Sequence, residues 1–126
     1  MMSLLIVEDN EEVRQFIKEM LSDLADTIHE CSDGAEALTV YTRYNPDWVL
    51  MDIEMKEVDG LTATRQIKAA FPDARIVIVT QYNDPRLREA AREAGASEYV
   101  LKDDLTSLYG LLGIASDRLR DIQSRE

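Results

Sequence analysis

Five polar residues of this chain come directly after short apolar segments, and together they could transfer a phosphoryl group: Glu8, Asp9, Asp52, Thr80 and Lys102. Three carboxylates held a few ångströms apart repel one another, so a lysine and a divalent cation would be needed to offset their charge. Oxygen ligands favour a hard cation, Mg²⁺ or Mn²⁺. Beside such an ion, an Asp carboxylate can act as a nucleophile and become an aspartyl phosphate, while the amine and the hydroxyl contact other phosphoryl oxygens.

The spacing of apolar residues predicts the elements that would bring these groups together. Short apolar runs predict strands at 4–7, 27–31, 48–51, 76–79 and 99–101. Helical spacing predicts helices over 10–24, 34–45, 60–72, 84–95 and from 103 or 104 through 119. This alternation indicates an α/β fold, a flavodoxin-like (βα)5 arrangement with a doubly wound five-stranded parallel sheet and helices on both faces. The carboxyl ends of parallel strands meet at one edge, so the polar residues should converge there.

Length and charge restrict the class of protein. The 126 residues suit a single domain over 1–126, in which the tail from about residue 117 could begin a linker to an absent output domain. The formal net charge of −11 repels nucleic-acid phosphates, so we expect no direct nucleic-acid binding by this domain. The single cysteine, Cys31, excludes an internal disulfide. The apolar start ends at Glu8, too early for a signal peptide or a membrane span, and we expect a cytoplasmic protein.

Several other residues have simpler interpretations. His29, in the weak second strand, is expected to be structural or solvated, and Trp48 is expected to pack. The last helix has more apolar residues than one buried stripe needs, which could mark a dimer face, a partner site or a broad inner face: Leu108, Leu111, Leu112 and Ile114. The arginines at 118, 120 and 125 fit a solvated helix face or a linker. Each of the five polar residues could also be a strand cap or a solvated charge, but their expected convergence favours a site.

Four motifs make the chain similar to a known family. They are Leu5-Ile6-Val7-Glu8-Asp9-Asn10, Val49-Leu50-Met51-Asp52-Ile53-Glu54-Met55 with Asp59-Gly60, Val79-Thr80, and Tyr99-Val100-Leu101-Lys102. In this order, over essentially the whole chain, they resemble the receiver domain of two-component response regulators. The stretch from Gly95 to Asp104 is most similar to NarL/FixJ-type receivers, which usually precede a DNA-binding helix-turn-helix domain.

The resemblance implies a role for each residue of the expected site. Asp52 would be the phosphoacceptor and would take the group from the phosphohistidine of a sensor histidine kinase. Glu8, Asp9 and Asp52 would hold Mg²⁺, and the backbone carbonyl of Glu54 would complete the protein ligands. Lys102 would contact both the Asp52 carboxylate and the phosphate. The domain would catalyse only its own phosphorylation and dephosphorylation.

The resemblance also implies a switch. Thr80 would move its hydroxyl onto the phosphate, and Tyr99 would rotate inward behind it, while Asp59 and Gly60 would shape the loop after the acceptor. A hydroxyl that gains a partner only in the phosphorylated state biases an existing two-state equilibrium. The readout surface would be the fourth helix, fifth strand and fifth helix, where a partner protein or a second copy would dock.

Four residues depart from the family pattern. Lys56 stands where proline is frequent, so the loop after Asp52 should be less rigid. Gln81 and Tyr82 are bulky, and they could hinder access of the phosphodonor, slow the movement of the switch tyrosine, or shield the acyl phosphate from water. Asp103 replaces the proline that commonly follows the lysine, so the Lys102–Asp103 peptide bond should be trans.

Three other functions fit parts of the pattern. A receiver-like binding module that is never phosphorylated would share every motif. A Mg²⁺-dependent phosphatase of the haloacid-dehalogenase type has a nucleophile motif like Asp52-x-Glu54, but that nucleophile follows the first strand. A flavodoxin-like cofactor binder would need a glycine- or hydroxyl-rich loop after the first strand, where this chain has the acidic Glu8-Asp9-Asn10.

Overall fold

The computed structural model describes residues 2–113, in which strands and helices alternate. The strands are β1 (Ser3–Val7), β2 (Thr27–Cys31), β3 (Trp48–Met51), β4 (Ile76–Thr80) and β5 (Glu98–Leu101). The helices are α1 (Glu11–Met20), α2 (Gly34–Tyr44), α3 (Gly60–Ala70) and α4 (Pro85–Ala94). A 3₁₀ turn, η1 (Lys102–Asp104), follows β5, and a further helix occupies 107–113. The five predicted strands are confirmed in their order along the chain, with Ser3 added to β1, Thr80 to β4 and Glu98 to β5.

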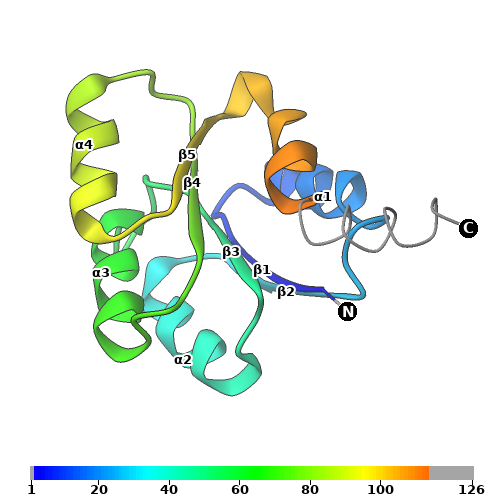
Figure 1. Cartoon of the computed structure of the whole chain (residues 1–126), viewed down its shortest axis with the longest axis horizontal. Helices are drawn as coiled ribbons and strands as arrows, with labels where there is room; N and C mark the ends of the chain where they lie inside the picture. The colour runs from blue at the N-terminus through cyan, green and yellow to red at the C-terminus, as the bar shows by residue number, and fades with distance from the viewer. Residues whose placement is uncertain (1, 114–126) are drawn as a thin grey trace, which may run out of the picture.

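The five strands form one parallel sheet in the order β2-β1-β3-β4-β5. Helices cover both of its faces: α1 and helix 107–113 lie on one side, and α2, α3 and α4 lie on the other (Figure 1). This is the doubly wound, flavodoxin-like arrangement that the alternating pattern predicts. All five carboxyl ends therefore lie at one edge of the sheet.

The apolar runs of the strands are continuous because both faces of the sheet are buried. In β1, Leu5 and Val7 pack with the core beneath α2 and α3, while Leu4 and Ile6 pack with the core beneath α1. In β4 every residue from Ile76 to Thr80 is buried. The two cores hold the strand ends in fixed register.

Capping side chains begin the helices at the carboxyl edge of the sheet. Each of α1 to α4 starts after a residue whose side chain accepts a backbone N–H of the first turn: Asn10, Asp33, Asp59 and Asp84. Such caps satisfy donors that have no partner within the helix. Gly95 ends α4 with a φ of 106°, a left-handed conformation that glycine adopts without steric cost.

Two helix boundaries differ from the sequence prediction. Helix α1 ends at Met20, whereas apolar spacing extends to Leu24, because Leu21–Leu24 form a turn that still buries Leu21. The last helix begins at residue 107 and not at 103 or 104. The chain leaves β5 through the tighter turn η1, which has no side-chain cap, and this turn delays the helix.

The remaining expectations concern packing. Leu108 and Leu112 are fully buried and Leu111 is partly buried against the same core, so these residues belong to a broad inner face. His29 stacks on Tyr44 with ring centroids 3.8 Å apart, and Trp48 packs against the core on the α1 side. Ile114, the arginines near the C-terminus and the expected linker lie outside the described residues. Over residues 2–113, no helix combines the length and apolar character needed to cross a bilayer.

Candidate functional site

Three carboxylates meet where β1 and β3 end. One oxygen of each of Glu8, Asp9 and Asp52 lies within 4.8 Å of the others. The register of the sheet explains this, because Val7 pairs with Met51 and the residue that follows each of these strand ends is acidic. Glu8 is 2% exposed and Asp52 is 5% exposed, whereas Asp9 faces solvent. A cluster that offers only carboxylate oxygens suits a hard cation.

The ammonium group of Lys102 lies between two of these carboxylates. Its Nζ is 2.9 Å from Oε1 of Glu8 and 3.2 Å from Oδ1 of Asp52. Lys102 is the first residue after β5, so the positive charge comes from an edge strand of the sheet. One ammonium cannot neutralise three carboxylates, and the cluster keeps a net negative charge that favours a divalent cation.

The electrostatic environment raises the pKa of the Asp52 carboxyl to about 7. Burial is the main cause and the charge of Glu8 adds to it, while Lys102 opposes the rise. Burial alone would lower the pKa of Lys102, but its contacts with Glu8 and Asp52 outweigh that effect and raise it. Strong shifts of this kind collect at functional sites. A cation bound to the cluster would favour the ionised form of Asp52.

Thr80 and Tyr99 are joined through the backbone of Tyr82. Thr80 ends β4, is 1% exposed, and accepts a hydrogen bond at its Oγ1 from the Tyr82 N–H at 3.2 Å. The Tyr99 hydroxyl donates to the Tyr82 carbonyl at 2.6 Å, and the guanidinium of Arg88 lies 4.4 Å from the centre of the Tyr99 ring. Residues 80–82 therefore connect the strand end to the expected switch tyrosine.

The site opens into a pocket of about 350 Å³. The pocket is lined by Glu8, Asp9, Asp52, Thr80 and Lys102, together with Asn10, Glu54, Met55, Lys56, Gln81 and Tyr82. All five residues predicted from the strand ends are thus brought together. The Tyr82 hydroxyl donates a hydrogen bond to the Glu54 carboxylate, which links the loops after β4 and β3. Tyr99 is not among the lining residues.

The residue that caps α2, Asp33, anchors the loop after Asp52. The buried carboxylate of Asp33 accepts hydrogen bonds from the backbone N–H groups of Glu57 at 2.9 Å and Val58 at 3.0 Å. The loop then returns to the sheet at Gly60, where a Cβ atom would collide with the backbone carbonyl of Asp52. Lys56 lacks the restraint of proline, but hydrogen bonds anchor its neighbours. The Lys102–Asp103 bond is trans, since none of the described residues has a cis peptide bond.

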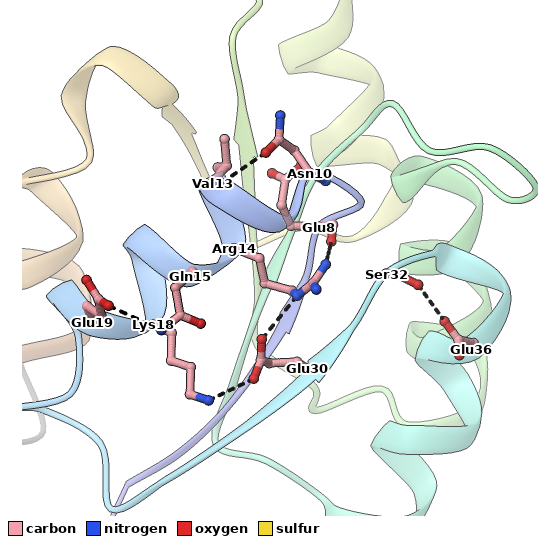
Figure 2. A network of polar contacts seen from close by, with 10 residues as sticks. All are labelled: Glu8, Asn10, Val13, Arg14, Gln15, Lys18, Glu19, Glu30, Ser32 and Glu36. Carbon is pink, nitrogen blue, oxygen red and sulfur yellow. Dashed lines mark hydrogen bonds and ion pairs between the residues drawn. The ribbon is translucent and has the colours of Figure 1, made fainter.

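Sequence reasoning missed two residues that support the site. Asp33 was not expected to reach a loop 24 and 25 positions away. Arg14 donates to the backbone carbonyl of Glu8 at 2.8 Å and pairs with Glu30 (Figure 2). Its only sequence signal is a basic residue one turn after the Asn10 cap, among the acids of α1.

A family model and curated relatives agree with this geometry. The model of the response regulator receiver domain matches residues 4–111. The transcriptional regulatory protein YhcZ of Bacillus subtilis is 36% identical over 104 residues, which cover 81% of this chain and 49% of that protein. The chemotaxis protein CheY of Halobacterium salinarum is 36% identical over 98 residues, with 78% and 82% covered. The chain thus spans about half the length of YhcZ and most of that CheY.

Solved structures show the same fold. A DNA-binding response regulator of the LuxR family from Staphylococcus aureus superposes with a TM-score of 0.78 at 30% identity, covering 86% of this chain and 92% of that one. The CheX–CheY–BeF3–Mg²⁺ complex of Borrelia burgdorferi gives 0.79 at 26% identity, with 89% and 87% covered. With its sheet topology, its acidic edge and these matches, the chain belongs to the receiver domains of two-component response regulators.

Proposed function

We propose that this domain accepts one phosphoryl group on Asp52 in a reaction that needs Mg²⁺. The observation that carries the proposal is the meeting of Glu8, Asp9 and Asp52 within 4.8 Å, with Lys102 in contact with two of them. These carboxylates and the backbone carbonyl of Glu54 would hold Mg²⁺, or Mn²⁺ in its place. When bound, the ion would neutralise charge on the phosphoryl oxygens.

The chemistry follows from the buried carboxylate. An oxygen of Asp52 forms a bond to the donor phosphorus as the bond from phosphorus to the phosphohistidine nitrogen breaks, and the imidazole leaves with that electron pair. Lys102 lies within 3.2 Å of the attacking group and stabilises charge on the transferred phosphoryl oxygens. Attack requires the ionised carboxylate, so whatever lowers the raised pKa of Asp52 also prepares the nucleophile.

The switch proceeds through Thr80 and Tyr99. In this structure the Thr80 hydroxyl oxygen accepts the Tyr82 N–H. A phosphoryl group on Asp52 offers the Thr80 hydroxyl a strong acceptor. Movement of Thr80 would displace Tyr82, whose carbonyl holds the Tyr99 hydroxyl. The readout surface is α4, β5 and the helix over 107–113, available to a partner or a second copy.

Partners follow from the family. The donor is a sensor histidine kinase in the cytoplasm. The chain spans about half the length of YhcZ, so we further propose that it acts as the receiver of a longer regulator whose output domain binds DNA. This domain itself, at a net charge of −11, binds no nucleic acid.

A second function has one observation in its favour. Tyr82 and Glu54 both line the pocket and are joined by a hydrogen bond, a closed contact that suits a receiver that binds partners without being phosphorylated. Such a module would keep the fold and the readout surface, and it would never take a phosphoryl group on Asp52.

Mass spectrometry after incubation with acetyl phosphate and Mg²⁺ separates the two functions. We expect the protein to gain one phosphoryl group, and to gain none when EDTA is present from the start. Asp52→Asn should accept none, while Asp59→Asn, which alters a capping carboxylate outside the cluster, should accept one. Continued labelling of Asp52→Asn would place the acceptor elsewhere. A chain that stays unmodified with both acetyl phosphate and phosphoramidate would favour the binding module.

A further inference from the structure

A single peptide unit joins Glu8 to Asp9, two of the three carboxylate residues, and both backbone polar groups of Glu8 have hydrogen-bond partners. Glu8 follows β1, and its N–H donates to the carbonyl of Cys31 at 3.1 Å. The carbonyl of Glu8 accepts a hydrogen bond from Nη1 of Arg14 at 2.8 Å. This carbonyl belongs to the peptide that links Glu8 to Asp9, so its orientation helps to decide where both side chains point.

Arg14 is well placed to hold this peptide. It lies on α1, and its backbone N–H donates to Asn10, the residue that caps the helix. Its side chain is only 17% exposed. Figure 2 shows the guanidinium between the carbonyl of Glu8 and the carboxylate of Glu30, which comes from β2.

Glu30 fixes the direction of the guanidinium. Nε of Arg14 lies 3.1 Å from Oε1 of Glu30, and Nζ of Lys18 lies 2.9 Å from Oε2 (Figure 2). The hydrogen bond from Lys18 is the main cause that lowers the pKa of Glu30, so this carboxylate stays ionised. The donors of a guanidinium form a rigid planar fork. With Nε bound to Glu30, Nη1 has little freedom to leave the Glu8 carbonyl.

We propose that Arg14 is a positioning residue for the cation site: by holding the Glu8–Asp9 peptide, it keeps both carboxylates directed at Asp52. The inference rests on the proposed Mg²⁺ site. Residues that orient metal ligands from outside the coordination sphere typically change metal affinity by roughly ten- to a hundredfold when they are replaced.

Charge alone predicts the opposite sign. The guanidinium is positive and lies one peptide behind the carboxylates, so it repels an incoming cation. If charge were its only influence, a neutral residue at position 14 would tighten Mg²⁺ binding, and lysine would leave it unchanged. A positioning role predicts weaker binding for both replacements, because neither can bridge the Glu8 carbonyl and Glu30 with a planar fork.

The test is the dissociation constant of Mg²⁺, measured by isothermal titration calorimetry without a phosphodonor. We expect Arg14→Met to bind Mg²⁺ at least roughly tenfold more weakly than the parent chain, and Arg14→Lys to lie between them. Lys18→Met is the matched control, since it removes a cation from the same Glu30 and leaves the contact with Glu8 intact. Its affinity should stay within about twofold of the parent value. Thermal unfolding in EDTA verifies that each variant is folded at the temperature of the titration.

Each outcome decides the matter. Equal or tighter binding by Arg14→Met, beside normal binding by the parent chain, overturns the positioning role and leaves the metal site standing. Equal weakening in Lys18→Met also overturns it, because the loss would then come from the Glu30 pairs. A parent chain that binds no Mg²⁺ overturns the proposed site itself, and the role of Arg14 with it.

Discussion

The carboxylate of Asp33 accepts a hydrogen bond from the backbone N–H of Val58 at 3.0 Å, across 25 positions of the sequence. Through this bond the start of α2 holds the loop that follows the acceptor strand. Gly34 allows the approach, because a Cβ atom there would collide with the carbonyl of Val58. The same carboxylate caps α2 through the N–H of Ala35 at 2.9 Å.

Asp33→Asn should therefore destabilise the fold. Loss of a buried, charged acceptor costs about 1–3 kcal/mol of unfolding free energy, measurable by urea titration. Asp84→Asn, a cap on α4 that does not reach another loop, should cost less. Burial acts to raise the pKa of Asp33, but the backbone N–H groups outweigh it and hold the pKa below its usual value. The stability difference should thus be full above about pH 4 and shrink as the pH falls. A pH-independent difference would contradict this account.

Asp52→Asn should stabilise the metal-free fold, and the gain should depend on pH. The pKa of Asp52 is raised to about 7, so ionising it costs the folded state free energy as the pH rises from about 4 to 7. The variant avoids this cost. Urea unfolding in EDTA should show no gain near pH 4 and a gain of a few kcal/mol near pH 8, since one pKa unit corresponds to about 1.4 kcal/mol. Adding Mg²⁺ should reduce the gain; an asparagine variant less stable at pH 8 would refute the prediction.

Tyr82→Phe should speed phosphorylation by small donors. The hydroxyl of Tyr82 donates a hydrogen bond to Glu54, and both residues line the pocket. We expect a donor that enters the pocket to displace this contact. A hydrogen bond to a carboxylate contributes about 1.5 kcal/mol, so loading by acetyl phosphate should quicken by up to roughly tenfold. Tyr109→Phe is the control, because its hydroxyl donates to the carbonyl of Met20. Unchanged loading by Tyr82→Phe and Glu54→Gln would show that the contact does not limit access.

Two glycine replacements should have opposite effects. Gly60→Ala places a Cβ against the carbonyl of Asp52, so it should lower both thermal stability and the rate of phosphorylation. Gly110→Ala places a Cβ in open space on the helix over 107–113, so it should stabilise the fold by about 1 kcal/mol and leave phosphorylation unchanged. Differential scanning calorimetry and the loading assay measure both. Normal loading by Gly60→Ala would show that the loop tolerates displacement.

The sequence predicted those parts of the site that depend on local pattern and on the parallel sheet. Strand ends are visible as apolar runs, so Glu8 and Asp52 could be placed at one edge before their distance was known. Arg14 and Asp33 could not be found this way, because each binds backbone that only the tertiary fold brings near. The start of the last helix was wrong for a related reason: Asp103 and Asp104 look like caps, but the chain forms η1 there.

The burial of β4 on both faces has a consequence for how a signal leaves the acceptor. Every residue of β4 from Ile76 to Thr80 is buried. Because close-packed interiors have low compressibility, this strand has little freedom to move when Asp52 is phosphorylated. The proposed switch therefore depends on the short segment 81–84, which follows Thr80, contains Tyr82 and leads into α4. Insertion of one residue into segment 81–84 should leave Asp52 able to accept a phosphoryl group. The same insertion should prevent phosphorylation from changing the readout surface.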